Sequence, residues 1–131
     1  MMKVRNQTCI IDDDAIAVFG LKRAMAAVDF TSELSTFGHG LDALEHFGQL
    51  LEDGSELPSL IFIDLNMPVM GGWYFMEEFI KLIPSKKDRP EVFIMTSSLD
   101  IRDVEKAKYL GLEDHYIIKP ITSDVLLGIL G

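Results

Sequence analysis

Short apolar runs alternate along the chain with longer stretches in which apolar residues recur at helical spacing. The runs have the length and the β-branched or aromatic bias of strands. Two of them, Leu60 to Ile63 and Val92 to Met95, are apolar on both faces, as buried parallel strands are. The pattern predicts strands at Thr8 to Ile11, Leu34 to Phe37, Leu60 to Ile63, Val92 to Met95 and Tyr116 to Ile118.

The stretches between these runs predict helices, because their apolar residues recur at i, i+3, i+4 and i+7 and so share one face. Gly111 follows the fourth stretch, where it suits a helix C-cap. Core packing is expected for Trp73, Phe75, Met76 and Phe79 on the third. The predicted helices are Ala15 to Val28, a second with Leu41, Leu44, Phe47 and Leu51 on one face, Trp73 to Ile83, Asp100 to Leu110 and Thr122 to Leu130.

Strands that are each followed by a helix predict right-handed βαβ crossovers and a parallel sheet covered on both faces. The chain has 131 residues, no internal repeat and no linker, so one α/β domain over residues 1–131 is expected. In open sheets of this kind, functional groups gather beyond the carboxyl ends of the strands, near the point where the strand order reverses.

Polar residues follow four of the five predicted strands, at the point where each strand ends. Because the carboxyl ends of parallel strands share one edge of the sheet, that edge should receive carboxylates, hydroxyls and an ammonium group. The four groups are Asp12-Asp13-Asp14, Asp64, Thr96-Ser97-Ser98 and Lys119-Pro120.

The carboxylates of Asp12, Asp13 and Asp64 predict a bound divalent cation. Two carboxylates within about 4 Å repel each other by roughly 4 kcal/mol at an effective dielectric constant near 20, so all three should not stay ionised without one. An all-oxygen site with room for water suits Mg²⁺. No histidine or cysteine is placed to recruit zinc, and the consecutive acidic triplet lacks the alternating spacing of a calcium loop.

Asp64 has the surroundings of a phosphoryl acceptor. It stands alone at the end of the central predicted strand, where it can face both the acidic pair and Lys119. A carboxylate flanked by Mg²⁺, the Lys119 ammonium and the Thr96 hydroxyl combines a nucleophile with partners for the oxygens of a transferring phosphoryl group. Asp64 is therefore the candidate nucleophile.

Charge and composition narrow the choice of partners. The net charge of -9 repels nucleic acid and anionic lipid, so cationic protein surfaces or metal ions are better-matched partners. No apolar run reaches the ~18 residues that span a bilayer, and the N-terminus lacks the hydrophobic stretch of a signal peptide. The single cysteine, Cys9, cannot form an internal disulfide and is expected to be buried on its strand. These features predict a cytoplasmic protein.

The strand-end residues belong to a series of longer motifs: Ile11-Asp12-Asp13-Asp14, the stretch from Asp64 to Gly72, Thr96-Ser97 and the stretch from Tyr116 to Pro120. In this order they closely resemble the receiver domain of bacterial two-component response regulators. The resemblance runs from about Lys3 to the chain end. It implies a flavodoxin-like (βα)5 domain, doubly wound, with strand order 2-1-3-4-5.

The resemblance also implies a function. Asp64 would be the phosphoacceptor of a two-component or phosphorelay system, and a histidine kinase or histidine phosphotransfer protein would supply the phosphoryl group. The protein would be a switch rather than an enzyme, limited to self-phosphorylation from small donors and self-dephosphorylation. In the implied Mg²⁺ site, Asp13 binds the ion directly and Asp12 largely through water, beside Asp64 and the backbone carbonyl of Asn66.

Further residues take roles from the same resemblance. Lys119 would pair with the phosphoryl group, Thr96 would hydrogen-bond to it, and Tyr116 would be the aromatic switch residue. Asn66 and Ser98 fall at positions that tune dephosphorylation. The Lys119-Pro120 bond is expected to be cis. A downstream protein is expected to bind the face formed by the fourth helix, fifth strand and fifth helix.

The chain departs from the family pattern in several places. The segment Leu51 to Pro58 lengthens the connection before the third strand and is expected to extend the second helix. Gly71-Gly72 should loosen the loop after Asp64, and Ser97 should slightly narrow phosphoryl access. The final helix is shorter than is usual in the family.

Several local and functional alternatives stand beside this interpretation. Asp14 is expected to cap the helix that follows it. His39, His46 and His115 fit no ligand pattern and are expected at the surface. A Mg²⁺-dependent hydrolase with an aspartyl-phosphate intermediate would need a second aspartate where Asn66 stands.

Two further alternatives concern the whole chain. One is a receiver-shaped binding module that is never phosphorylated. The other is a receiver domain excised from a larger hybrid kinase or regulator, which the short last helix favours. The Met-Met start and the lack of a linker instead favour a stand-alone chain.

Overall fold

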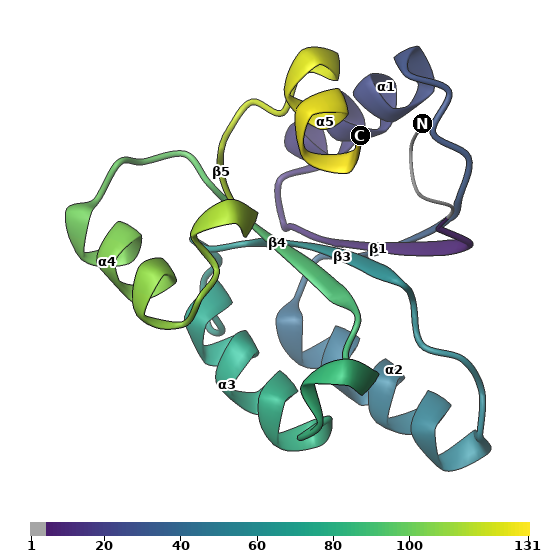
Figure 1. Cartoon of the computed structure of the whole chain (residues 1–131). Coiled ribbons are helices and arrows are strands. Elements are labelled where there is room, and N and C mark those ends of the chain that lie inside the picture. The colour runs from purple at the N-terminus through teal and green to yellow at the C-terminus, as the bar shows by residue number, and fades with distance from the viewer. Residues whose placement is uncertain (1–4) are drawn as a thin grey trace.

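The computed structural model describes residues 5–131, so the Met-Met start and Lys3 lie outside the described residues. In the described part, five parallel strands form one sheet in the order β2-β1-β3-β4-β5 (Figure 1). The predicted α/β class and strand order are confirmed. The strands are β1 (Gln7–Ile11), β2 (Glu33–Phe37), β3 (Leu60–Asp64), β4 (Glu91–Thr96) and β5 (Tyr116–Ile118).

An α-helix follows each strand, with bounds close to those predicted. Short 3-10 helices, η1 (Lys86–Asp88) and η2 (Glu113–His115), precede β4 and β5. These two were not predicted, because one turn is too short to show a hydrophobic period. The α-helices are α1 (Ala15–Ala27), α2 (Gly40–Asp53), α3 (Gly72–Leu82), α4 (Ile101–Tyr109) and α5 (Ser123–Leu130).

The sheet separates two hydrophobic layers. In Figure 1, α1 and α5 lie on one side of the sheet, and α2 and α3 lie on the other. Alternate residues of one strand enter opposite layers: Ile61 and Ile63 pack with α2 and α3, whereas Phe62 packs with α1 and α5. The fully apolar pattern of Leu60 to Ile63 reflects this burial on both faces.

Helix ends follow local capping chemistry. The Asp14 carboxylate accepts hydrogen bonds from the backbone N–H groups of Ile16 and Ala17, which confirms the predicted cap of α1. Gly54 ends α2 in the left-handed region at φ 69°, and α2 reaches Asp53, as the longer connection predicted. With eight residues, α5 is short, as expected.

The burial of Cys9 and His115 can be compared with what the sequence predicted for them. Cys9 is fully buried, and burial, opposed by a hydrogen bond with Ser35, raises its pKa to about 12. His115 is half-buried, with 31% of its side chain exposed, so the expectation of a surface position holds only in part. Its ring stacks on Phe93 with centroids 4.5 Å apart, and its Nε2 lies 2.9 Å from Glu91 Oε2. A long-range ring contact of this kind leaves no periodic signal in the sequence.

The other two histidines also reach the surface. His46 is exposed, and half-buried His39 caps α2 by accepting a hydrogen bond at Nδ1 from the Leu41 N–H. Within residues 5–131, no helix is both long enough and apolar enough to cross a membrane.

Candidate functional site

Strand register brings the candidate residues to one edge of the sheet. Ile11 of β1 pairs with Ile63 of β3, so the residues that follow them, Asp12 and Asp64, leave neighbouring strands at the same level. Thr96 is the last residue of β4 and pairs with Ile118, directly before Lys119. The predicted convergence of acid, hydroxyl and ammonium groups is therefore present in the fold.

Asp12, Asp13 and Asp64 form an acidic cluster. One carboxylate oxygen from each lies within 4.8 Å of the other two. Asp12 and Asp64 are each only 5% exposed, whereas Asp13 is open to solvent. The Asp14 backbone N–H donates to Asp12 Oδ1 at 2.9 Å and helps to hold that carboxylate in place. This donor set consists of oxygens alone, reaches solvent through Asp13 and fits a hard divalent cation.

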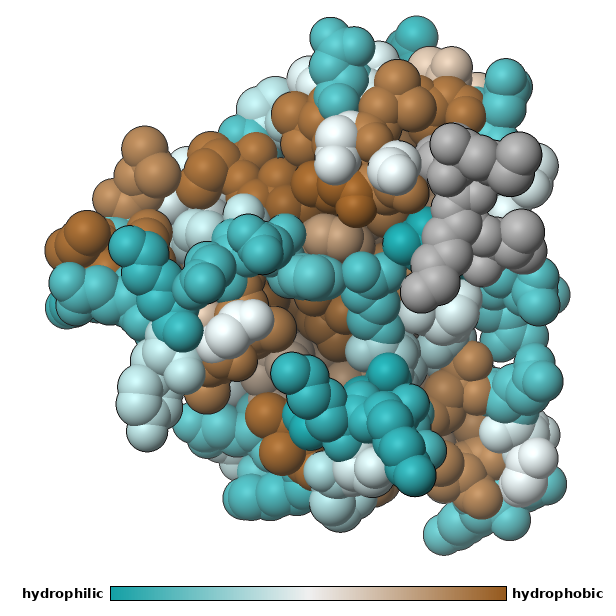
Figure 2. Space-filling model, in the orientation of Figure 1, coloured by the Kyte–Doolittle hydropathy of each residue, from teal (hydrophilic) through white to brown (hydrophobic). Residues whose placement is uncertain are grey.

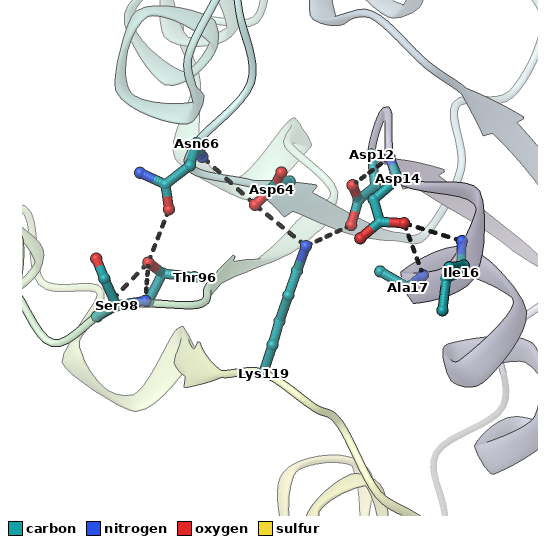
Figure 3. Close-up of polar contacts among 9 residues, drawn as sticks. All are labelled: Asp12, Asp14, Ile16, Ala17, Asp64, Asn66, Thr96, Ser98 and Lys119. Carbon is teal, nitrogen blue, oxygen red and sulfur yellow. Dashed lines mark hydrogen bonds and ion pairs between the residues drawn. The ribbon is translucent and has the colours of Figure 1, made fainter.

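Lys119 joins the two buried carboxylates. Its Nζ lies 2.7 Å from Asp12 Oδ2 and 3.3 Å from Asp64 Oδ1 (Figure 3). The Lys119-Pro120 peptide bond is cis, as expected, and the Lys119 N–H donates to the Thr96 carbonyl at 2.7 Å. Burial alone would lower the pKa of Lys119, but the carboxylates of Asp12 and Asp64 outweigh it and raise that pKa.

The pKa of Asp64 is raised. Burial is the largest cause and the negative charge of Asp12 the next, while Lys119 and the Asn66 N–H pull the pKa in the opposite direction. One ammonium therefore does not fully compensate the cluster. The electrostatics favour a second positive charge beside these carboxylates.

Thr96 and Asn66 meet on the other side of Asp64. The Thr96 hydroxyl donates to Asn66 Oδ1 at 3.0 Å, and the Ser98 N–H donates back to Thr96 Oγ1 at 3.2 Å (Figure 3). The Asn66 N–H reaches Asp64 Oδ1 at 3.4 Å. In this conformation the Thr96 hydroxyl is held by Asn66, a contact between residues that are far apart in the sequence.

Tyr116 lies at the start of β5 with its hydroxyl directed inward. Among residues 5–131, the buried Tyr116 hydroxyl has no hydrogen-bond partner of good geometry. Burial, followed by the negative charge of Asp103, raises its pKa. The ring packs against the hydrophobic layer that contains α2 and α3.

Gly72 has a packing role in the loop after Asp64. A Cβ at this position would lie 2.9 Å from the Leu65 Cα, and the Gly72 N–H donates to the Leu65 carbonyl at 3.0 Å. The glycine pair was predicted to loosen this loop. The structure instead gives Gly72 a close backbone approach that only a glycine permits.

Trp73 and Asp103 form a contact that the sequence did not reveal. Trp73 Nε1 donates to Asp103 Oδ1 at 2.9 Å, and the Lys106 ammonium lies 5.4 Å from the Trp73 ring centroid. Trp73 is the second residue of α3, whereas its two partners lie on α4. This half-buried tryptophan therefore ties α4 to α3 instead of serving only as core.

Comparison with known proteins decides the family. Residues 8–130 match the family described as "Response regulator receiver domain". The chain belongs to this family. A crystal structure of a two-component response regulator from Cytophaga hutchinsonii is 30% identical to this receiver domain, with a TM-score of 0.84 over 97% of this chain and 95% of that chain.

More distant relatives agree with this assignment. The Mn²⁺-bound form of response regulator Rcp1 shares the fold, with a TM-score of 0.72 and 22% identity over 96% of this chain and 90% of that one. "Regulator of RpoS" from Escherichia coli (strain K12) is 28% identical over 118 residues, which are 90% of this receiver domain and 31% of that protein. The chain thus spans about a third of the length of that relative.

Proposed function

We propose that this receiver domain is a phosphoacceptor switch in which Asp64 takes a phosphoryl group from a histidine kinase or histidine phosphotransfer protein. The observation that carries the proposal is the placement of Asp64. Its carboxylate lies in an acidic cluster, 3.3 Å from the Lys119 ammonium, in a chain that belongs to the receiver family.

The proposed Mg²⁺ site consists of Asp12, Asp13, Asp64 and the backbone carbonyl of Asn66. Support comes from three carboxylate oxygens within 4.8 Å of one another and from the raised pKa of Asp64. When bound, the ion would neutralise charge that develops on the phosphoryl oxygens. The structure of Rcp1, which shares this fold, was determined with Mn²⁺ bound, so Mn²⁺ belongs beside Mg²⁺ in binding experiments.

The protein groups then have distinct proposed tasks. Asp64 Oδ1 contacts both Lys119 and the Asn66 N–H, which leaves Oδ2 as the attacking atom. A bond forms between Oδ2 and phosphorus while the bond from phosphorus to the donor nitrogen breaks, and that nitrogen keeps the electron pair. Lys119 holds a phosphoryl oxygen by charge. Thr96 would donate to another oxygen after its hydroxyl leaves Asn66.

Asn66 and Ser98 are proposed to set the lifetime of the phosphorylated state. Asn66 is exposed beside Asp64, and Ser98 is exposed two residues beyond Thr96. A water molecule that hydrolyses the phosphoryl group must pass these two side chains, so their size and polarity would set the rate of hydrolysis. An asparagine at position 66 has no ionisable proton for general acid–base catalysis, which argues against a turnover hydrolase.

The phosphodonor is proposed to dock on α1 beside the site. Ile16 and Phe19 project from α1 with 83% and 61% of their surface exposed. A groove of about 680 Å³ runs from this helix to the segment after β5, and Lys119 lines it. A partner seated on this hydrophobic surface could bring a phosphohistidine to Asp64.

The output surface is proposed to be the face of α4, β5 and α5. Large hydrophobic side chains are exposed there and do not form part of the core. They include Leu99, Ile101, Tyr109 and Ile118. A shift of Thr96 toward a phosphoryl group would open space next to Tyr116, because the Thr96 side chain interacts with the Tyr116 hydroxyl. Phosphorylation would thus change the population of states on this face.

Phosphoryl transfer can be tested with acetyl phosphate or phosphoramidate and Mg²⁺, followed by intact-mass analysis. The wild type is expected to gain one phosphoryl group, and Asp64→Asn is expected to gain none. Asp53→Asn, at the exposed end of α2, is the matched control and should label as the wild type does. Labelling of Asp64→Asn at the wild-type level, or no labelling of the wild type, would overturn the proposal.

A further inference from the structure

A second groove lies at the opposite edge of the sheet from the acidic cluster. It has a volume of about 590 Å³ and is lined by residues that precede or begin strands, including Arg5, Ser59 and Glu91. Asp64 and Thr96 end their strands, so the two sites occupy opposite ends of β3 and β4. Figure 2 shows a hollow with hydrophobic surface at its floor, between the hydrophilic segments of η1 and η2.

The charge of this groove opposes that of the whole chain. The net charge is -9, yet Arg5, Lys86, Arg89 and His115 line the groove together with a single acidic residue, Glu91. Both Glu91 oxygens are already engaged, one by Arg5 Nη2 at 2.8 Å and the other by His115 Nε2 at 2.9 Å. Glu91 is therefore not free to neutralise Lys86 and Arg89.

Arg89 supplies the observation that points to a ligand. Its Nε is buried and has no hydrogen-bond acceptor among residues 5–131. A buried donor without a partner is unfavourable, and a guanidinium group presents paired N–H donors that match carboxylate and phosphate oxygens. Arg89 lines the groove, so an anion bound there can pair with its guanidinium group.

The wall next to Arg89 is held in place by a chain of contacts. Arg5 is 6% exposed and pairs with Glu91, which bonds His115, which stacks on Phe93. Burial alone would raise the pKa of Glu91, but Arg5 and His115 outweigh it and lower that pKa. Glu91 thus stays ionised at neutral pH and keeps this wall fixed, so the groove is formed before any ligand arrives.

The remaining lining is apolar. It includes Met76, Phe79 and Ile80 of α3, together with Val92 and Leu112. The volume falls in the range of about 300–1,000 Å³ that is usual for small-molecule sites, which combine apolar walls with a few placed polar groups. A ligand that satisfies both parts has an apolar body and an anionic head.

From these contacts we infer that this groove binds a small organic anion, with a carboxylate or phosphate head on Arg89 and Lys86 and an apolar body against α3. The inference does not depend on phosphorylation of Asp64. The acidic cluster at the other edge repels anions in the absence of a metal, so the two sites can be told apart in metal-free buffer.

The test is a titration of the full chain with 1-naphthyl phosphate in metal-free buffer, followed by two-dimensional amide NMR. Saturable shifts are expected at Ser59, Glu91, Gly111 and Leu112. Inorganic phosphate and 1-naphthol, which carry the head and the body alone, should each bind at least about tenfold more weakly, equal to ~1.4 kcal/mol. The absence of saturable shifts at millimolar probe, or shifts confined to the Asp12 edge, would overturn the inference.

Variants locate the anionic head. Arg89→Gln is expected to weaken binding of 1-naphthyl phosphate about tenfold or more, since the change removes the charge and the paired N–H donors of the guanidinium group. Arg102→Gln, whose side chain on α4 is 86% exposed, is the matched control and should bind as the wild type does. Lys86→Gln, an exposed change on η1, decides the matter if Arg89→Gln loses its folded spectrum. Wild-type affinity in both groove variants would refute the site.

Discussion

Lys119 offers the sharpest test of the electrostatics at the acidic cluster. Its Nζ lies 2.7 Å from Asp12 and 3.3 Å from Asp64, with only 16%, 1% and 7% of the three side chains exposed. At an effective dielectric constant near 20, these distances correspond to attractions of about 6 and 5 kcal/mol. Desolvation of the three groups offsets much of this, and breaking a buried ion pair typically costs about 3–5 kcal/mol. Because Asp13 opens the cluster to water, we expect Lys119→Met to lower the free energy of unfolding by about 3 kcal/mol.

Urea unfolding in metal-free buffer, followed by circular dichroism, measures this loss as a function of pH. The pKa of Lys119 is raised, so its stabilising contribution is complete below the ordinary value of 10.5 and is lost as pH rises through the higher folded-state pKa. As pH falls through the raised pKa of Asp64, that carboxylate takes up a proton and attracts the ammonium less, so the difference between Lys119→Met and the wild type should shrink. Mg²⁺ should restore part of the lost stability.

Lys108→Met, at the exposed end of α4, is the matched control and should change stability little. A loss below about 0.5 kcal/mol for Lys119→Met would refute the reasoning, because that size is typical of a solvated surface pair. A loss that stays constant from neutral to acidic pH would also refute it.

Three further predictions concern the metal and the local packing. The pKa of Asp64 is raised, so protons compete with Mg²⁺ for this carboxylate. Calorimetric titrations should therefore show that the affinity for Mg²⁺ falls as pH drops through that pKa. An affinity that does not change with pH would contradict this prediction. Gly72→Ala should cost about 1–3 kcal/mol in urea unfolding, since its Cβ would lie 2.9 Å from backbone, while Gly48→Ala, with nothing within 4 Å, should be neutral or stabilising; equal effects would refute the packing role. Trp73→Phe removes the hydrogen bond to Asp103 and should speed amide exchange in α4 by roughly tenfold; unchanged exchange would show that this contact does not hold the helix.

The fold was predictable because it rests on patterns that are local in sequence. The apolar run that contains Phe62 and Ile63 predicts a strand buried on both faces. Apolar residues at helical spacing predict the helices that cover the sheet. The candidate site was also predictable, because parallel strands carry whatever follows them to one edge. The strand order alone predicts that Asp12, Asp64 and Lys119 lie close together, without any knowledge of side-chain geometry.

The other contacts were not predictable, since each depends on which partner a side chain meets. Trp73 and Asp103 lie 30 residues apart, and Arg5 and Glu91 lie 86 apart. A hydrophobic pattern reports that a position avoids water and does not report its neighbour. The packing role of Gly72 was hidden for the same reason, because a glycine in a loop indicates flexibility unless the opposing backbone is known.

The central claim is that Asp64 itself carries the phosphoryl group. An acyl phosphate is reduced by borohydride to an alcohol, which converts a phosphorylated aspartate into homoserine. After incubation with acetyl phosphate and Mg²⁺, followed by borohydride and peptide mass spectrometry, homoserine is expected at position 64 and nowhere else. Homoserine at Asp12 or Asp13, or its absence from position 64 in a sample whose intact mass shows one phosphoryl group, would contradict the account.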